Sequence, residues 1–206
     1  MQIISLPLHP QNAPAATLTA YLPDLVQPKP RRAVIICPGG GYAFVSPRES
    51  EPIALTFAAQ GMAAFVLDYA VAPVRYPAAL RQLAEAMRVV RAHADAWQLT
   101  QILVCGFSAG GHLAASLGTQ YDQAVLADYD AAVIRPDGLL LAYPVITGGR
   151  FAHRDSFTNL LGAGEATTQS LENLVTSQTP PTFIWTTADD QTVPAMNSLL
   201  FVEALQ

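Results

Sequence analysis

Charged residues and cysteines are scarce in this chain. Asp, Glu, Lys and Arg together make up 13% of the 206 residues, and the only cysteines are Cys37 and Cys105. Two cysteines cannot build the disulfide framework of a small secreted domain, so stability must come from an apolar core. Hydrophobic residues make up 51%, which excludes an intrinsically disordered chain. We therefore expect a single globular domain over residues 1–206.

Basic residues are also few, and long apolar runs are missing. The chain has 11 Lys and Arg against 16 Asp and Glu, a net charge of -5, which excludes the basic surface of a nucleic-acid-binding protein. No apolar stretch approaches the roughly 20 residues that span a bilayer. The first residues lack the basic and apolar segments of a signal peptide. We expect a soluble, cytoplasmic protein with no nucleic acid or membrane as a partner.

Short apolar runs without strict alternation recur along the chain. Such runs are typical of strands that are buried on both faces of a parallel sheet. They cover residues 33–37, 63–68, 102–106, 138–143 and 182–187. The segments 3–8 and 17–22 alternate more strictly, which predicts antiparallel strands at one edge of the sheet.

Helical patterns separate these strands. An apolar stripe at spacings of three and four runs from Leu80 to Trp97, and Pro77 suits the first helical position. A shorter helix is expected over about 52–60, ended by Gly61, and another starts at 110–111. This alternation predicts an α/β fold with a mostly parallel sheet and helices on both faces. Residues 145–181 are irregular and are expected to form a cap-like insertion.

Residues 106–110 read Gly-Phe-Ser-Ala-Gly, between a buried strand and a helix. This is the context in which G-x-S-x-G forms a nucleophile elbow. A serine forced into a strained backbone conformation at a sharp turn leaves no room for side chains two positions away, which explains both glycines. The helix that follows directs backbone N–H groups and a partial positive charge at the serine. The pattern predicts Ser108 as a nucleophile; the alternative is an ordinary strand-to-helix turn.

A run of three glycines follows the first buried strand, in the sequence Cys-Pro-Gly-Gly-Gly-Tyr from residue 37. Glycines let backbone amides approach an oxygen that gains negative charge during attack on a carbonyl. The amides of Gly40, Gly41 and Ala109 are therefore predicted to form an oxyanion hole. A phosphate-binding loop is the alternative, but the run lacks the Lys-Ser/Thr of a P-loop and the spacing of a dinucleotide fingerprint.

Two adjacent aspartates follow the last apolar run. A carboxylate at this place can orient an imidazole and stabilise its charged form. The alternative is a solvated turn in which an aspartate makes local hydrogen bonds. We predict Asp190 as the catalytic acid, with Asp189 as its structural neighbour.

The motifs P-G-G-G-Y, G-F-S-A-G-G-H and A-D-D-x-x-V-P together resemble the α/β-hydrolase superfamily. The chain is similar to its small esterases, related to acetyl and acetylxylan esterases and to hormone-sensitive-lipase-like carboxylesterases, over nearly its whole length. The stretch from His153 to Gly162 shares this likeness. The resemblance implies an α/β-hydrolase fold and a serine carboxylic-ester hydrolase acting on small acetyl-type esters, carbohydrate esters among them, through an acyl-serine intermediate. It implies neither cofactor nor metal.

The chain departs from this family at two places. Pro38 replaces the histidine of the His-Gly-Gly-Gly motif, which leaves the mechanism intact because the backbone supplies the amides. The triad order of the superfamily is Ser, Asp, His, yet no histidine follows Asp190. His112 is expected to pack near the elbow, His153 to lie in the cap, and the two remaining histidines, His9 and His93, to lie on the surface.

The order of the triad leads to a hypothesis about the chain's length. The catalytic histidine, a last strand and a last helix are expected beyond residue 206, so the chain is predicted to be a truncated form with little activity and a tendency to form homo-oligomers. Two alternatives remain open: a prolyl-oligopeptidase-like serine peptidase, and a non-catalytic α/β-hydrolase-like binding protein. The residues do not identify the natural ester.

Overall fold

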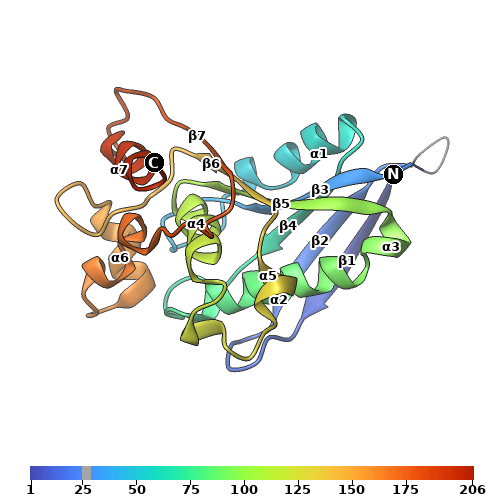
Figure 1. Ribbon diagram of the computed structural model, residues 1–206, viewed down its shortest axis with the longest axis horizontal. Coiled ribbons are helices and arrows are strands. Elements are labelled where there is room, and N and C mark those ends of the chain that lie inside the picture. Colours follow the sequence, from blue (N-terminus) through green and yellow to red (C-terminus); the bar gives the residue numbers. More distant parts are fainter. Residues whose placement is uncertain (25–28) are drawn as a thin grey trace.

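Seven strands form one sheet over the residues that the computed structural model describes, 1–24 and 29–206, in the order β1-β2-β4-β3-β5-β6-β7 (Figure 1). They are β1 (Gln2–Leu8), β2 (Ala16–Leu22), β3 (Arg31–Cys37), β4 (Ala63–Asp68), β5 (Leu99–Phe107), β6 (Gly138–Ala142) and β7 (Thr182–Trp185). β2 pairs antiparallel with β1 and β4, and the other pairs are parallel. The predicted mostly parallel sheet with antiparallel strands at one edge is confirmed.

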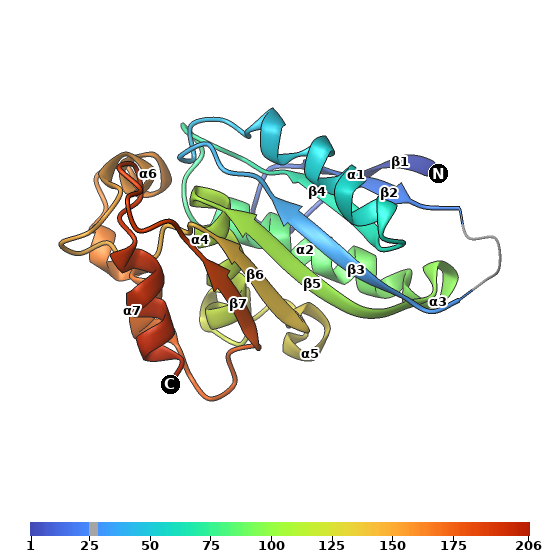
Figure 2. The ribbon, with the colours of Figure 1, turned by 90° about the horizontal axis from the view of Figure 1, so that it is seen from above.

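Helices cover both faces of this sheet. They are α1 (Glu51–Ala59), α2 (Ala78–Ala92), α3 (Ala94–Trp97), α4 (Ala109–Gln120), α5 (Ala131–Ile134), α6 (Arg154–Leu161) and α7 (Met196–Ala204). α1 lies on one face, and α2 and α4 lie on the other (Figure 2). Alternate residues of β3 enter the two cores, with Ile35 on the α2 and α4 side and Ile36 on the α1 side. β3 reads as one apolar run because both of its faces are buried.

The apolar stripe from Leu80 to Trp97 does not form one helix. α2 ends at Ala92, and the stripe continues in the short α3. Pro77, predicted as the first helical residue, is instead the N-cap of α2, and the helix begins one position later at Ala78. His93, expected on the surface, is partly buried: its ring stacks on Trp97 with the centroids 4.4 Å apart, and its Nδ1 lies 2.8 Å from the carbonyl oxygen of Val89. Facing aromatic rings bury part of each other, which helical periodicity alone does not predict.

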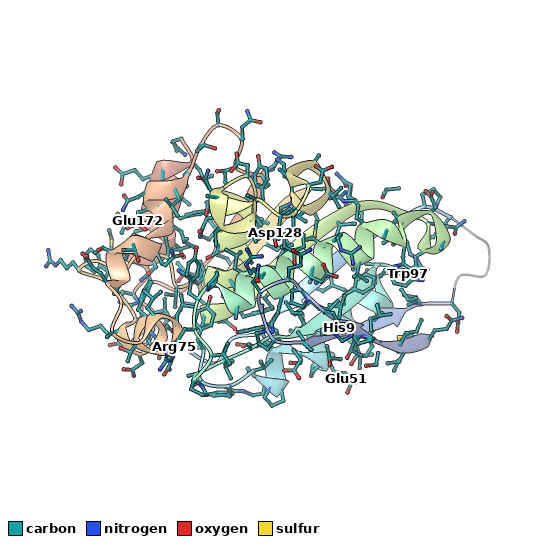
Figure 3. All side chains as sticks on the ribbon, turned by 90° about the horizontal axis from the view of Figure 1, so that it is seen from below. His9, Glu51, Arg75, Trp97, Asp128 and Glu172 are labelled. Carbon is teal, nitrogen blue, oxygen red and sulfur yellow. The ribbon has the colours of Figure 1, made fainter. Side chains whose placement is uncertain are left out.

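The segment 145–181 contains α6 and two 3₁₀ helices, η3 (Ala166–Gln169) and η4 (Leu171–Leu174). α6 and α7 lie at the same end of the molecule as the carboxyl ends of the parallel strands (Figures 1 and 2). From the α2 side, Arg75 reaches the carbonyl oxygen of Asn159 in α6 (Figure 3). The segment is therefore attached to the sheet end where loops of several strands meet. Its function as a cap stays a prediction.

No helix within residues 1–24 and 29–206 has both the length and the apolar composition of a membrane span.

Candidate active site

Ser108 occupies a strained turn between β5 and α4. Its φ of 52° and ψ of -117° are values that non-glycine residues rarely adopt. A Cβ atom on Gly106 would lie 2.2 Å from the carbonyl oxygen of Gly110, and one on Gly110 would lie 2.0 Å from that of Cys37. Side chains at these two positions would collide with backbone. The crowding inferred from the sequence is present, and it lets α4 start directly against the end of β3.

The triple-glycine loop follows β3 and turns back on itself. Gly40 and Gly41 have φ values of 125° and 62°, which favour glycine. The carbonyl oxygen of Gly39 accepts a hydrogen bond from the N–H of Ser46 at 2.9 Å, and that of Gly40 accepts one from the N–H of Ala43 at 3.0 Å. Both loop carbonyls are therefore engaged inside the turn. The C=O and N–H of a trans peptide point in opposite directions, so the amides of Gly40 and Gly41 point away from these partners.

Ser108, Gly40, Gly41 and Asp190 line one cavity of about 570 Å³. Ala109 is fully buried beside it as the first residue of α4, where backbone N–H groups have no acceptor within the helix. The structure thus brings the five predicted site residues to one place. Their catalytic roles stay predictions.

Asp190 also holds its own loop together. Its Oδ1 accepts the N–H groups of Thr192 at 2.8 Å and Val193 at 2.9 Å. The local turn considered as an alternative is thus present, but its two hydrogen bonds use only Oδ1 of the Asp190 carboxylate. The same side chain also lines the cavity. Asp189 is exposed, as expected of a structural neighbour.

Two histidines lie near Ser108. His153 lines the cavity as the N-cap of α6, and its Nδ1 is 2.8 Å from Ser156 Oγ. His112 is buried in α4 and lies 3.0 Å from two groups, with Nε2 facing the carbonyl oxygen of Gln169 and Nδ1 facing Tyr42 Oη. A carbonyl only accepts, so Nε2–H donates and Nδ1 accepts from Tyr42. The prediction that His112 packs near the elbow is confirmed.

The stability of the fold should depend on the protonation of His112. Burial, opposed by the hydrogen bond to Gln169, lowers the pKa of His112 from 6.5 to about 4. The unfolded chain therefore binds the proton first as the pH falls. The contribution of neutral His112 to the free energy of unfolding is fully present above pH 6.5 and is lost as the pH falls toward 4. Over this range the free energy of unfolding falls by about 1.4 kcal/mol per pH unit.

Urea unfolding measured between pH 7 and 4 checks this expectation. The His112→Gln variant should lack this part of the pH dependence, whereas the control His93→Gln should keep it. An equal fall in the unfolding free energy of all three proteins would contradict a role for His112.

Polar residues that the sequence did not single out also line the cavity. They are Ser46, Arg48, Glu49, Tyr143, Asp155, Asn159 and Thr192. One positional signal was present: Tyr143 directly follows β6, at the sheet edge where the other loops meet. The remaining residues come from turns and from α6, and their position depends on contacts far apart in the sequence. Within residues 1–24 and 29–206, no group of three His, Cys, Asp or Glu side chains is arranged to hold a metal ion.

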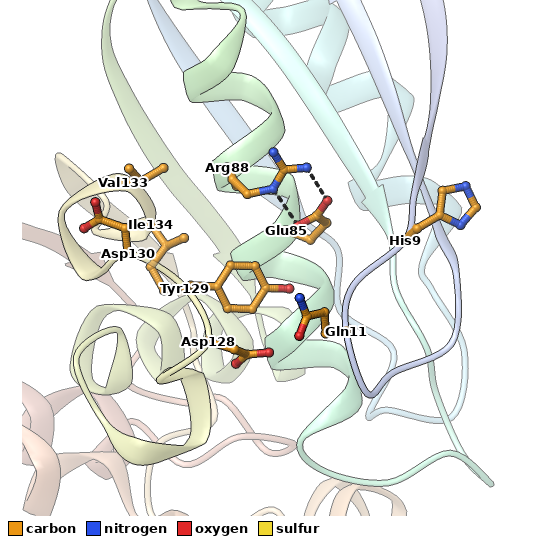
Figure 4. Close-up of a pocket in the computed structure, with 9 residues that line it drawn as sticks. All are labelled: His9, Gln11, Glu85, Arg88, Asp128, Tyr129, Asp130, Val133 and Ile134. Carbon is orange, nitrogen blue, oxygen red and sulfur yellow. Dashed lines mark hydrogen bonds and ion pairs between the residues drawn. The ribbon is translucent and has the colours of Figure 1, made fainter.

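A second cavity, of about 350 Å³, lies between Gln11, α2 and the 128–134 segment (Figure 4). None of its lining residues lines the Ser108 cavity. Two ion pairs involve its lining residues: Glu85 with Arg88, both in α2, at 2.6 Å, and Asp128 with Arg81 of α2 at 2.6 Å. The hydrogen bond from Arg81 lowers the pKa of Asp128. The second pair connects α2 with the 128–134 segment, which is a structural role.

The chain is similar to known hydrolases, several of which are named esterases. Residues 18–136 match the family model described as BD-FAE. The chain is 39% identical to endo-1,4-beta-xylanase B of Butyrivibrio fibrisolvens and 31% identical to an acetylxylan esterase of Xylanibacter ruminicola, over 85% and 93% of its length. It spans only 30% and 40% of those two proteins. The crystal structure of an acetyl ester-xyloside bifunctional hydrolase from Caldicellulosiruptor lactoaceticus is also similar, with a TM-score of 0.84, 41% identity, and coverage of 94% of this chain and 74% of that one.

Proposed function

Because this chain belongs to the BD-FAE family of α/β-hydrolases, we propose that it hydrolyses small acyl esters, of the acetyl type, through an acyl-serine intermediate on Ser108. The observation that carries the proposal is the cavity where the strained Ser108 meets the two glycines, Gly40 and Gly41. A positioned hydroxyl beside unengaged amides is the arrangement that acyl transfer needs.

The proposed mechanism follows from this arrangement. Ser108 Oγ attacks the acyl carbon and gives its proton to a general base, while the carbonyl oxygen becomes an oxyanion that accepts hydrogen bonds from Gly40, Gly41 and Ala109. The tetrahedral intermediate releases the alcohol, which takes a proton from the base, and leaves the acyl group on Ser108. A water then gives a proton to the base and attacks the acyl carbon. The bond from this carbon to Ser108 Oγ breaks, Oγ takes the proton back from the base, and the acid leaves. Asp190 orients the base and stabilises its charged form; the four histidines of this sequence all precede Asp190, and none is assigned as the base.

Esters of hydroxyl-rich alcohols, such as acetylated sugars, are the substrate class that we favour. The cavity is lined by the polar side chains of Arg48, Asp155 and Asn159, which can hydrogen-bond to hydroxyl groups of the leaving alcohol. Two of the relatives carry names that refer to xylan, and the similar solved structure is an acetyl ester-xyloside hydrolase.

A comparison of substrates tests this proposal. We expect kcat/KM for p-nitrophenyl acetate to exceed that for p-nitrophenyl octanoate by at least about tenfold, because a site for a small acyl group has no room for added methylenes. Acetylated xylose should release acetate at a measurable rate. Preferred cleavage of a proline p-nitroanilide would instead favour the peptidase alternative. Absence of both turnover and phosphonate labelling would favour a binding protein.

A further inference from the structure

Glu49 connects two loops of the site through its carboxylate. It ends the 3₁₀ helix η1 (Pro47–Glu49), and both of its oxygens accept hydrogen bonds. Oε2 accepts the backbone N–H of Gly39 at 2.8 Å, and Oε1 accepts the hydroxyl of Tyr143 at 2.9 Å. The first partner lies in the loop after β3 and the second directly after β6. One side chain thus joins the ends of two strands that β5 separates in the sheet.

Gly39 lies close to Ser108. A Cβ atom on Gly39 would lie 2.8 Å from Glu49 Oε2, 2.9 Å from the carbonyl oxygen of Phe107 and 3.1 Å from Ser108 Cβ. The peptide of Gly39 is therefore enclosed between the carboxylate on one side and the elbow on the other. A shift of Glu49 would free the loop to move away from Ser108.

The hydrogen bond to Glu49 also determines which amides remain for the substrate. The N–H of Gly39 donates to Glu49, so it is engaged within the protein. The next two amides, of Gly40 and Gly41, belong to peptides whose carbonyls are held by Ser46 and Ala43. Glu49 and these backbone bonds together orient a loop in which the N–H groups of Gly40 and Gly41 donate to no acceptor within residues 1–24 and 29–206.

Tyr143 is the second group that Glu49 holds. Its φ of 36° is strained, its N–H donates to the carbonyl oxygen of Trp185 at 2.7 Å, and its ring packs edge-on against the Trp185 indole with the centroids 5.1 Å apart. Burial, followed by the hydrogen bond to Glu49, raises the pKa of the Tyr143 hydroxyl well above its usual value. Tyr143 therefore stays protonated and remains a donor to Glu49 at neutral pH.

We propose that Glu49 is a positioning residue for the ester-hydrolysis reaction, holding the triple-glycine loop and Tyr143 so that the amides of Gly40 and Gly41 face Ser108. The inference rests on the proposed function. A carboxylate is suited to this role because it offers an acceptor on each oxygen, and each donor comes from a different loop. Its effect on the reaction passes through the loop, without contact between Glu49 and the reacting atoms.

Substitution of Glu49 tests the role. Glu49→Ala removes both acceptors, and we expect kcat for p-nitrophenyl acetate to fall by about tenfold to a hundredfold, because the loss of one oxyanion donor costs about 10²–10³ and a loosened loop loses part of that. KM should change by less than about twofold, since the interaction acts mainly in the transition state. Glu49→Gln should restore most of kcat, because the amide oxygen can accept from Gly39 while the amide N–H₂ donates to Tyr143 Oη.

Glu51 provides the matched control. It lies two residues further on, and its Oε1 also accepts a tyrosine hydroxyl, that of Tyr21, at 3.2 Å, but it does not line the cavity. Glu51→Ala should leave kcat unchanged. Hydrogen exchange of the backbone amides of residues 39–46, measured by mass spectrometry, should speed up in Glu49→Ala and not in Glu51→Ala.

The measurements test the role of Glu49 and the proposed ester hydrolysis separately. An unchanged kcat in Glu49→Ala, or a Glu49→Gln variant as impaired as Glu49→Ala, would overturn the positioning role. If the unsubstituted protein hydrolysed no ester, the proposed function would fail, and the exchange measurement would then decide on Glu49 alone. Unchanged exchange in Glu49→Ala would overturn the inference in that case also.

Discussion

Replacing Ser108 with alanine should abolish ester hydrolysis and covalent labelling together. The hydroxyl of Ser108 is the only protein group in our mechanism that bonds to the acyl carbon, and it lies in the cavity beside Gly40 and Gly41. Loss of the nucleophile in a serine hydrolase costs on the order of 10⁶ in kcat. Turnover of p-nitrophenyl acetate should therefore fall to the residual level that the oxyanion hole and substrate binding alone support, and a fluorophosphonate probe should add no mass to the variant.

Ser46→Ala is the control for this experiment, because Ser46 lines the same cavity and supports the loop through its backbone. It should keep both the label and the turnover. Residual turnover in Ser108→Ala at the level of the unsubstituted protein would exclude the acyl-serine mechanism. Labelling that persists in the variant would place the nucleophile elsewhere.

Replacing Gly110 with alanine should destabilise the whole fold. The added Cβ would lie 2.0 Å from the carbonyl oxygen of Cys37 and 2.4 Å from that of Pro38. Backbone cannot move aside as a flexible side chain can, so α4 would have to separate from the end of β3. We expect a loss of more than about 4 kcal/mol in the free energy of unfolding, at the upper end of single substitutions, measured by urea titration.

A second glycine in the same helix separates this collision from the general effect of adding a methyl group. At Gly118 the new Cβ would first meet the side-chain atom Cδ1 of Leu139, at 2.6 Å. A leucine side chain can rotate, so Gly118→Ala should cost roughly 1–3 kcal/mol. Equal losses at the two positions would argue against a backbone collision at Gly110.

The fold was predictable from the sequence because its central strands are buried on both faces. β3, β4, β5 and β6 each appear as an apolar run, and the runs alternate with helical patterns, as an α/β-hydrolase fold requires. That fold and the esterase-related family are confirmed. The boundaries of helix α2 were predicted less accurately than the strands. The helix begins after Pro77 and ends at Ala92, and these ends are set by tertiary packing more than by the local sequence.

The site was predictable only where its chemistry demands a local pattern. Glycines flank Ser108 because of crowding within a few residues, so the elbow is visible in a short stretch of sequence. The pairing of Glu49 with Tyr143 spans 94 residues, and the hydrogen bond from Tyr42 to His112 spans 70. Neither pair follows a spacing that a sequence motif could record. They form because strand ends converge at one edge of the sheet.

The contact between Trp185 and Tyr143 gives the protein a natural optical reporter. Only two tryptophans occur in the chain, and the other, Trp97, is stacked on His93 far from the cavity residues. Trp185 is 45% exposed, so its emission responds to solvent, while its neighbour Tyr143 lines the cavity. In a Trp97→Phe background, the wavelength of Trp185 emission would report changes at the Tyr143 side of the cavity through this contact, without an attached dye.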